Sequence, residues 1–435
     1  MTILNESGIP DVLSPLHGIN ELVEKLPGAV VAVIGTRAEA YLAQSLASAL
    51  EGGSPTARRN PKTLFVVLDP AEAPEGGRIA SRLIAEAAGI SGTRMMLLAA
   101  GRSAELIGVD VEFEARMVSR RLDIPVNTVS LDPDPGSPGC LCTDLEDHTL
   151  ASLVDLCPTG TSDRLEMSAQ NPKQGGLFGG FLGRVREDTR AGQRSVVLLG
   201  PSGGLDAELE RVGVEVAGGV PGQDVATLPA IGEGTLVAIT SPYLKASRAA
   251  GERGAKVIRT LTPIGIDGTA RFIQDVAAAA GVEANEMSRA RAAWESMEHL
   301  RNRIRGKRIF FAGDTGFEIP LARFLADAGA VVLEVGAPRL DKRFLAEEIQ
   351  ALGADVDVVE LPDWRGQIKR ADETRPDVVI SSPGLYAPLV ARGHLCRSAH
   401  DLLDVGVHGY EGARRILELL VRTFERAETL DSINL

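Results

Sequence analysis

The sequence predicts an α/β protein built from three units, each with a parallel sheet covered by helices. Short β-branched apolar segments alternate with amphipathic helical segments along most of the 435 residues. This alternation is typical of strands that are buried on both faces. A strand that ends in glycine and opens into a helix occurs three times, at Gly35, Gly200 and Gly313. We therefore expect three α/β units, each of about the size of one domain.

The first unit is expected over residues 1–158. Apolar, β-branched segments predict its strands at residues 30–35, 63–69, 94–100 and 125–131. Stretches such as YLAQSLASAL and GGRIASRLIAEAAG have the periodicity of amphipathic helices. Residues 159–194 then break the pattern, because they are polar and rich in glycine. We expect this segment to be a linker or a long excursion.

The second and third units repeat the opening of the first. The second, residues 195–306, begins with the strand SVVLLG and closes with a long helical stretch. In that stretch, apolar side chains at helical spacing predict a stripe that faces the core: Met287, Trp294, Met297, Leu300 and Ile304. The third, residues 307–435, begins with RIFFAG and ends in the helix GYEGARRILELLVRTF. Ligands in such folds bind beyond the carboxyl ends of the strands, so clefts between the units are the expected site.

Composition excludes several classes of protein. The net charge of −13 argues against a nucleic-acid binder, which needs a basic face for phosphates. Hydrophobic residues make up 44% of the chain, as in folded proteins. No apolar run approaches the ~20 residues that span a bilayer. The first residues, MTILNESGIPDVLS, lack the basic and apolar segments of a signal peptide. The sequence therefore predicts a cytoplasmic protein without a membrane span.

The common catalytic motifs are missing. The chain has no P-loop, no HExxH, no GxSxG, and no GxGxxG after a strand. ATP hydrolysis by this chain and a dinucleotide site are therefore not expected. Each strand–glycine–helix opening has two interpretations, an anion cradle at a helix N-terminus or a tight turn. In GDTGFE, Asp314 or Thr315 is predicted to N-cap the following helix.

Three of the four cysteines lie close together in the sequence. Cys140, Cys142 and Cys157, with His148 between them, offer soft ligands of the kind that bind zinc or iron–sulfur clusters. Their spacing matches no common ligand pattern, so buried or incidental cysteines are the favoured interpretation and a thiol site is the alternative. So few cysteines in a long chain do not indicate a disulfide framework.

Several segments resemble one protein family. VIGTRAEAYLAQ resembles a strand and turn written V-G-[ST]-R-T-C-A-H, AAGRSAELIGVDVEFEA resembles G-S-C-x-S-E-V-x-x-x-D-L, and DLEDHTLASL resembles Q-G-E-D-T-x-L-A-A. TPIGIDGTARFIQDVA is similar to a P-x-G-x-x-G-T segment, and FEIPLARFLADAGAVVLEV and RPDVVISSPGLYAPLVARGH resemble the third domain. The family is the component 1 superfamily of nitrogenase-like proteins, in particular the N subunit of light-independent protochlorophyllide reductase. The glycines expected in loops of the ligand cleft are Gly35, Gly200, Gly265, Gly268 and Gly313.

The resemblance implies a fold and a set of partners. The family has three Rossmann-like domains and assembles as a heterotetramer with a sister B-like subunit. An ATP-dependent, L-like iron protein supplies electrons, and a [4Fe–4S] cluster lies at the heterodimer interface. The enzyme reduces a double bond in ring D of protochlorophyllide by two electrons and two protons. The chain is thus expected to be an oxidoreductase subunit of (bacterio)chlorophyll biosynthesis that acts on a tetrapyrrole only within a complex.

The chain departs from the family at the cluster. Three of the cluster ligands are cysteines in the family, and the matching positions here are Ser14, Glu39 (with Ala38 as the alternative) and Arg102. Oxygen ligands are poor substitutes for thiolates on an iron–sulfur cluster, and arginine does not ligate iron. We expect Glu39 and Arg102 to lie within ion-pair distance of each other. We also expect an apolar pocket between the domains that is large enough for a porphyrin.

Three hypotheses follow. In the first, the chain is a divergent subunit of a tetrapyrrole reductase, and its cluster is absent, or is held by the sister chain or by the group Cys140, Cys142 and Cys157. In the second, it is a non-catalytic paralogue that binds a tetrapyrrole or metal cofactor, or scaffolds the assembly of a partner complex. The third, an unrelated α/β enzyme such as a sugar transferase, is disfavoured because phosphate and nucleotide motifs are missing.

Overall fold

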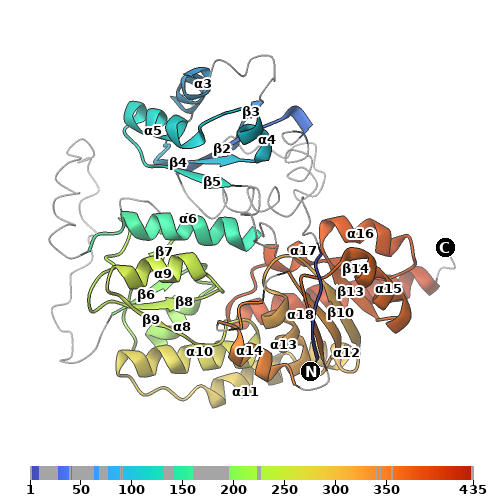
Figure 1. Ribbon diagram of the computed structural model, residues 1–435. Coiled ribbons are helices and arrows are strands. Elements are labelled where there is room, and N and C mark those ends of the chain that lie inside the picture. The colour runs from blue at the N-terminus through green and yellow to red at the C-terminus, as the bar shows by residue number, and fades with distance from the viewer. Residues whose placement is uncertain are drawn as a thin grey trace.

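The computed structural model contains three parallel sheets flanked by helices (Figure 1). The structure describes residues 2–8, 28–38, 41, 63–67, 77–88, 90, 92–130, 142–159, 195–222, 227–338, 340–342, 344–353 and 356–432. Within these ranges, no helix is both long enough and apolar enough to cross a membrane. The predicted α/β class with parallel sheets is confirmed.

The first sheet has four parallel strands from the N-terminal part of the chain. Their spatial order is β3 (Thr63–Val67), β2 (Ala29–Gly35), β4 (Met95–Ala100) and β5 (Val126–Ser130). β2 and β4 are buried along their full lengths, as their continuous apolar sequences predict. One face is covered by α3 (Gly77–Ala88) and α5 (Val111–Leu122), and α6 (Cys142–Leu156) packs on the other. The short helix α4 (Arg102–Leu106) follows β4.

The second sheet also has four parallel strands. Their order is β7 (Val216–Val220), β6 (Val196–Leu199), β8 (Leu236–Ile239) and β9 (Lys256–Ile258). The helices α8 (Leu205–Arg211) and α10 (Gly265–Ala280) cover one face, and α9 (Leu244–Glu252) lies on the other. α6 lies between the first two sheets and shares one hydrophobic core with both (Figure 1).

The third sheet has six parallel strands. Their order is β1 (Thr2–Asn5), β12 (Asp357–Glu360), β11 (Val331–Ala337), β10 (Arg308–Ala312), β13 (Val378–Ser381) and β14 (Cys396–Ser398). The helices of this unit are α13 (Glu318–Asp327), α14 (Ala346–Ala351), α15 (Trp364–Thr374), α16 (Pro383–Val390), α17 (Ala399–Asp404) and α18 (Gly409–Ser432). α11 (Met287–Ser296) and α12 (Glu298–Ile304) lead into it from the second unit.

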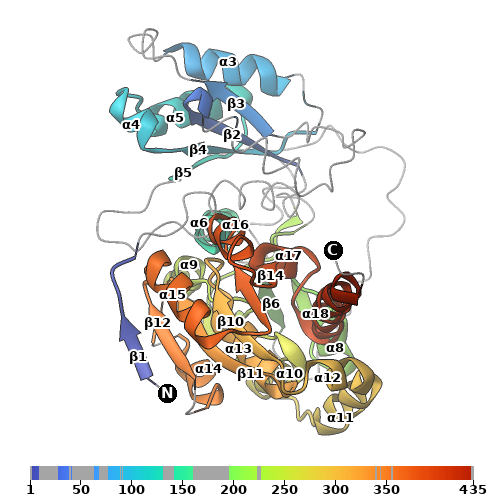
Figure 2. The ribbon, with the colours of Figure 1, turned by 90° about the vertical axis from the view of Figure 1, so that its right-hand side faces the viewer.

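The N-terminal strand corrects one expected boundary. Residues 1–158 were expected to form the first unit, but β1 lies beside β12 at the edge of the third sheet (Figure 2). Thr2 pairs with Asp357 and Asn5 with Glu360. Just after β1, Oε1 of Glu6 lies 2.7 Å from Nη1 of Arg370. Four exposed residues carry no sequence signal for the sheet they will join. The predicted linker, from residue 160 onward, lies outside the described residues.

The predicted apolar stripe is correct only in its second half. Met297, Leu300 and Ile304 are buried, but Met287 is exposed and Trp294 is half-buried. The stretch forms two helices that meet at Met297, so one helical period does not run through it. The expectation that Met287 faces the core was therefore wrong.

Candidate functional site

Loops at the carboxyl ends of the second sheet meet the third unit around His408. Ser241 follows β8, and its Oγ lies 3.0 Å from Nε2 of the buried His408. Phe317, from the loop after β10, meets the His408 ring edge-on with 6.1 Å between ring centres. Gly203, after β6, leaves no room for a side chain, because a Cβ there would lie 2.7 Å from Cβ of His408. This junction is where α/β sheets place ligands, and its histidine was not among the predicted residues.

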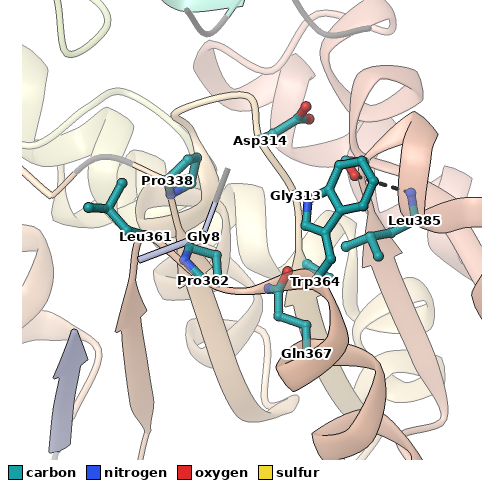
Figure 3. Close-up of a pocket in the computed structure, with 11 residues that line it drawn as sticks. Gly8, Gly313, Asp314, Pro338, Leu361, Pro362, Trp364, Gln367 and Leu385 are labelled. Atoms are coloured by element: carbon teal, nitrogen blue, oxygen red, sulfur yellow. Dashed lines mark hydrogen bonds between the residues drawn. The ribbon is translucent and has the colours of Figure 1, made fainter. Parts of the chain in front are cut away.

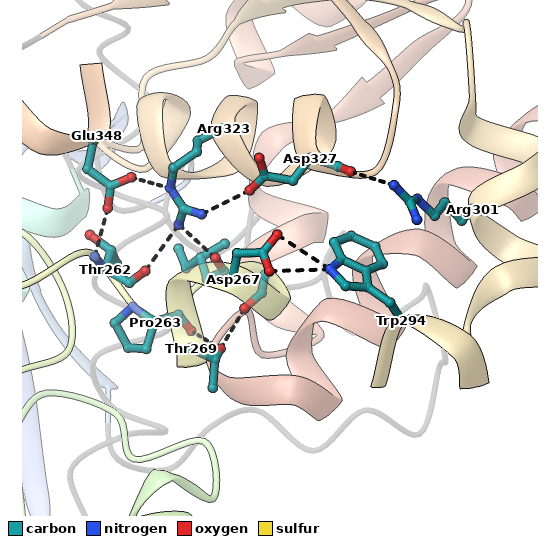
Figure 4. Close-up of polar contacts among 11 residues, drawn as sticks. Thr262, Pro263, Asp267, Thr269, Trp294, Arg301, Arg323, Asp327 and Glu348 are labelled. Carbon is teal, nitrogen blue, oxygen red and sulfur yellow. Dashed lines mark hydrogen bonds and ion pairs between the residues drawn. The ribbon is translucent and has the colours of Figure 1, made fainter. Parts of the chain in front are cut away.

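A buried ion pair of the third unit binds the backbone of the second unit beside this junction (Figure 4). Arg323, in α13, is 1% exposed, and its Nε lies 2.5 Å from Oε2 of Glu348 in α14. Its Nη2 donates to the carbonyl oxygens of Ile264 at 2.8 Å and Thr262 at 3.2 Å. Glu348 in turn accepts from the backbone N–H of Thr262 at 2.7 Å. Two carbonyl groups just before α10 thus each receive a donor from α13.

The glycines of the P-x-G-x-x-G-T segment allow α10 to approach α13 closely. Gly265 has a φ of +78°, and a Cβ there would lie 2.3 Å from Cδ2 of Phe324. At Gly268 a Cβ would lie 2.4 Å from Nη2 of Arg323 and 2.7 Å from the carbonyl oxygen of Thr262. Packing thus accounts for both glycines, and their expected place at a ligand cleft stays a prediction. Gly200, with a φ of +111°, likewise lies against Thr240 and Tyr243.

Gly268→Ala is expected to lower the free energy of unfolding by about 1–3 kcal/mol, because the added methyl group overpacks the Arg323 contact. Helix propensity alone would favour alanine by about 1 kcal/mol. Urea unfolding measures the change. Gly251→Ala, in α9, is the control, because a Cβ there meets no atom within 4 Å. A Gly268→Ala variant as stable as Gly251→Ala would contradict the packing argument.

The GDTGFE loop after β10 is held by Glu318 rather than by the predicted N-caps. The Glu318 carboxylate accepts from the Thr315 N–H at 2.6 Å, the Thr315 hydroxyl at 2.7 Å and the Gly316 N–H at 2.9 Å. Burial raises the pKa of Glu318, and these hydrogen bonds oppose the rise. The N-cap residue of α13 is Phe317, so the prediction for Asp314 or Thr315 was wrong. A Cβ at Gly313 would lie 2.6 Å from Oε1 of Glu318, so this turn too is tightly packed.

A small pocket lies at the carboxyl ends of the third sheet (Figure 3). The strand order reverses beside β10, between β11 and β13, which is where doubly wound sheets bind ligands. Asp314, Trp364 and Gln367 help to line it. Its volume of about 20 Å³ is room for about one water molecule. Nε2 of the buried Gln367 has no hydrogen-bond partner among the described residues. A single water suits this pocket, and the larger pocket expected for a porphyrin stays a prediction.

Comparison with protein families decides the class of this fold. The profile described as "Nitrogenase component 1 type Oxidoreductase" matches residues 76–425. The chain belongs to this family. A solved structure titled "Nitrogenase Cp1 at pH 6.5" has a TM-score of 0.63 to this component 1 chain at 13% identity, and the match covers 99% of this chain and 94% of the other. The fold class predicted from the sequence and from the resemblance is therefore confirmed.

Relatives of this component 1 protein match it over nearly its whole length. The light-independent protochlorophyllide reductase subunit N of Roseiflexus sp. (strain RS-1) is 32% identical over 435 residues, which is 99% of this chain and 96% of the relative. The subunit N of Chloroflexus aurantiacus is 30% identical over 434 residues, which is 99% of this chain and 90% of the relative. The predicted resemblance to this subunit is thus confirmed.

The three positions that match the family's cluster cysteines are only partly described. Ser14 and Glu39 lie outside the described residues. Arg102 is the first residue of α4, directly beyond the carboxyl end of β4, and its side chain is not described. The expected ion pair between Glu39 and Arg102 therefore stays a prediction. Gly35, the last residue of β2, lies at the same carboxyl edge of the first sheet.

Cys157 confirms the interpretation of a buried cysteine. It lies in the core between the first two sheets, and its Sγ donates to the carbonyl oxygen of Leu153 at 3.3 Å. Burial raises the pKa of the thiol to about 12, so it stays protonated, and the thiolate is the form that binds metals. His148 lies with Nε2 3.0 Å from the carbonyl oxygen of Thr128. Cys140 and the side chain of Cys142, the first residue of α6, lie outside the described residues.

The donors present do not fit a [4Fe–4S] cluster. Serine, glutamate and arginine stand where the resemblance implies three thiolates, and thiolates are the usual ligands of such clusters. Within the described ranges, no three His, Cys, Asp or Glu side chains are grouped to hold a metal ion. We therefore assign no cluster to this chain.

Proposed function

We propose that this chain is a subunit of a nitrogenase-like tetrapyrrole reductase of the protochlorophyllide or chlorophyllide type. The observation that carries the proposal is the match to subunit N relatives over 99% of the chain. Such a subunit would work with a sister B-like subunit and receive electrons from an ATP-dependent, L-like iron protein. Because that partner consumes ATP, we place the complex in the cytoplasm. The reaction would add two electrons and two protons to one ring double bond.

In this proposal the chain supplies the frame of the tetrapyrrole site rather than the redox centre. The positions Ser14, Glu39 and Arg102 offer no thiolate, and the buried Cys157 thiol stays protonated. A redox centre of the complex would therefore belong to the sister chain. The junction at Ser241 and His408 is the part of this chain where we expect polar contact with the ligand, since it lies at carboxyl ends of strands.

A second candidate function is a non-catalytic paralogue. It would bind a tetrapyrrole or metal cofactor, or scaffold the assembly of a partner complex. Its specific support is that all three positions matching cluster cysteines differ together. One altered ligand would weaken a cluster, whereas three altered ligands leave no thiolate to hold it.

One preparation separates the two candidates. The chain is coexpressed with its sister subunit, purified without oxygen, and assayed for protochlorophyllide reduction with the iron protein, ATP and a reductant. The first candidate expects reduction that requires this chain. The second expects no reduction, together with stoichiometric tetrapyrrole binding or a stable complex with the sister subunit. A chain that neither supports reduction, nor binds tetrapyrrole, nor assembles with the sister subunit would overturn both.

Restoring the three thiolates is expected to restore a cluster if the frame of the site is kept. The variant carrying Ser14→Cys, Glu39→Cys and Arg102→Cys should bind about four iron atoms and matching acid-labile sulfide per protomer in the complex. The unaltered chain should bind none. The matched control places alanine at the same three positions and should also bind none. A folded, assembled cysteine variant without iron would contradict the assignment of these positions.

A further inference from the structure

A groove separate from the His408 junction runs between α9, the edge strand β9, and the residues Asp341 and Phe344. We call it the α9 groove, and it has a volume of about 430 Å³. Small-molecule sites in proteins are commonly about 300–1,000 Å³. Residues that line the groove include Leu244, Arg248, Val257, Arg259, Asp341 and Phe344. β9 has a neighbour on one side only, so this groove lies at the open edge of the second sheet.

The floor of the α9 groove is apolar and firmly supported. Val257 and Phe344 are partly buried and pack against the core that joins the first two sheets. Leu244 is in the first turn of α9, whose N–H groups are held by Asp147. A ligand can therefore place an aliphatic or aromatic body on a surface that does not need to rearrange.

The rim of the groove carries two exposed arginines. Arg248 and Arg259 are exposed, and neither forms an ion pair or a side-chain hydrogen bond with any residue that the structure describes. The chain as a whole is acidic, with 59 Asp and Glu against 46 Lys and Arg. Two exposed guanidinium groups above an apolar floor are suited to a carboxylate, which they bind with charge-assisted hydrogen bonds.

Asp341 limits the class of anion that the α9 groove can bind. It lines the same groove, and its Oδ1 accepts from the backbone N–H of Phe344 at 3.1 Å, which fixes it on the wall. A fixed carboxylate repels ligands with several negative charges, such as phosphates, more strongly than it repels a single carboxylate. Nucleotides and inorganic phosphate are therefore disfavoured.

Two residues of the groove also line a smaller hollow that borders the His408 junction. A second hollow, of about 20 Å³, lies at the carboxyl ends of β8 and β9 and is lined by Ser241, Arg259 and Phe344 among others. Arg259 and Phe344 thus line both hollows. Ser241 is the partner of His408. A ligand in the groove would therefore contact two residues that line the same hollow as Ser241.

We infer that the α9 groove binds an amphipathic organic monocarboxylate. Its apolar body lies on Val257 and Phe344, and its carboxylate lies between Arg248 and Arg259. This site does not depend on the proposed function, because it uses neither the cluster positions nor the tetrapyrrole.

Binding of 1-naphthoate to the full-length chain tests the inference, with its neutral amide, 1-naphthamide, as the matched probe. Isothermal titration should give a Kd of about 1 mM or below for naphthoate. Naphthamide should bind at least about tenfold more weakly, because it lacks the charge that the arginines recognise. The naphthoate affinity should also fall as salt is raised.

Variants then locate the site. Arg248→Gln and Arg259→Gln should each weaken naphthoate binding about five- to tenfold, and the double variant should weaken it further. Arg291→Gln is the control, because Arg291 is exposed on α11 outside the groove. All three arginines are on the surface, so the variants should unfold at the same temperature as the parent chain. The inference is overturned if naphthoate does not bind, if naphthamide binds equally well, or if the double variant binds like Arg291→Gln.

Discussion

Replacing Arg323 by methionine is expected to lower the free energy of unfolding by about 3–5 kcal/mol. The variant keeps an unbranched apolar stem but leaves Glu348, which is equally buried, with a charge and no guanidinium partner. The carbonyl oxygen of Ile264 loses the Arg323 donor as well, while that of Thr262 keeps the N–H of Ile264 at 2.7 Å. Because these carbonyls belong to the second unit and Arg323 to the third, the loss falls on the contact between the two units.

Urea unfolding followed by tryptophan fluorescence measures this loss. The fluorescence of Trp294 is sensitive to unfolding of this region, because its ring stacks on that of Phe324, next to Arg323, with 6.1 Å between ring centres. Arg303→Met is the matched control. Arg303 pairs with Glu428 at 2.7 Å on the surface, and exposed pairs contribute about 0.2–1 kcal/mol.

A double variant, Arg323→Met with Glu348→Gln, distinguishes two causes of the loss. One is the missing attraction between Arg323 and Glu348, and the other is the cost of a buried Glu348 carboxylate without its guanidinium partner. If the uncompensated Glu348 carboxylate dominates the loss, the double variant is more stable than Arg323→Met alone. If Arg323→Met unfolds at the same urea concentration as Arg303→Met, the buried pair does not hold the second and third units together.

The fold could be predicted because its signals are local in the sequence. β6 is a continuous apolar run followed by Gly200 and the helix α8, and this pattern needs no knowledge of distant residues. Which strand a given strand pairs with, by contrast, depends on residues that are distant in the sequence. β1 has only four residues, all of them exposed, and its partner β12 lies near the other end of the chain. The sequence pattern therefore predicted the sheets but not the place of β1.

The contacts at the candidate site depend on residues that are distant in the sequence. Arg323 lies within the apolar segment IPLARFLA, where a basic residue indicates either a position at the surface or a buried ion pair. Only the fold shows that Glu348 and two carbonyl groups surround it. The positions of the missing cluster ligands, by contrast, came from the family resemblance. The backbone at Arg102 shows that this position follows the carboxyl end of β4, at the start of α4.

Asp147→Ala is expected to lower the free energy of unfolding by about 2–4 kcal/mol. Asp147 is buried in α6 and accepts from the first N–H groups of α9: Leu244 at 2.9 Å, Lys245 at 2.8 Å and Ala246 at 2.8 Å. α9 has no side-chain cap of its own, so alanine leaves three donors without an acceptor. Since α6 lies between the first two sheets, this carboxylate fixes α9 to the core that they share.

Asp110→Ala is the matched control for this variant. Asp110 caps α5 from an exposed position and accepts from one N–H group, that of Phe113, at 2.8 Å. Losing one exposed cap should cost about 1 kcal/mol. Urea unfolding of both variants gives the loss in the free energy of unfolding when one N–H group loses its acceptor, in Asp110→Ala, and when three do, in Asp147→Ala. Equal losses in the two variants would mean that Asp147 does not anchor α9.

The contribution of Asp147 to the free energy of unfolding is expected to change with pH in one direction. Burial raises the pKa of the Asp147 carboxyl to about 6, although the three N–H groups oppose the rise. A carboxyl whose pKa is raised on folding stabilises the folded state most below its unfolded pKa of about 3.9, and that stability is lost as the pH rises through 6. Asp147→Asn cannot titrate, so the free energy of unfolding of the parent chain relative to this variant should increase by about 1.4 kcal/mol between pH 7.5 and pH 5. Urea unfolding at both pH values measures the difference, in which the other titrating groups cancel. A relative stability that decreases at pH 5 would mean that the N–H groups outweigh burial and hold the carboxylate charged.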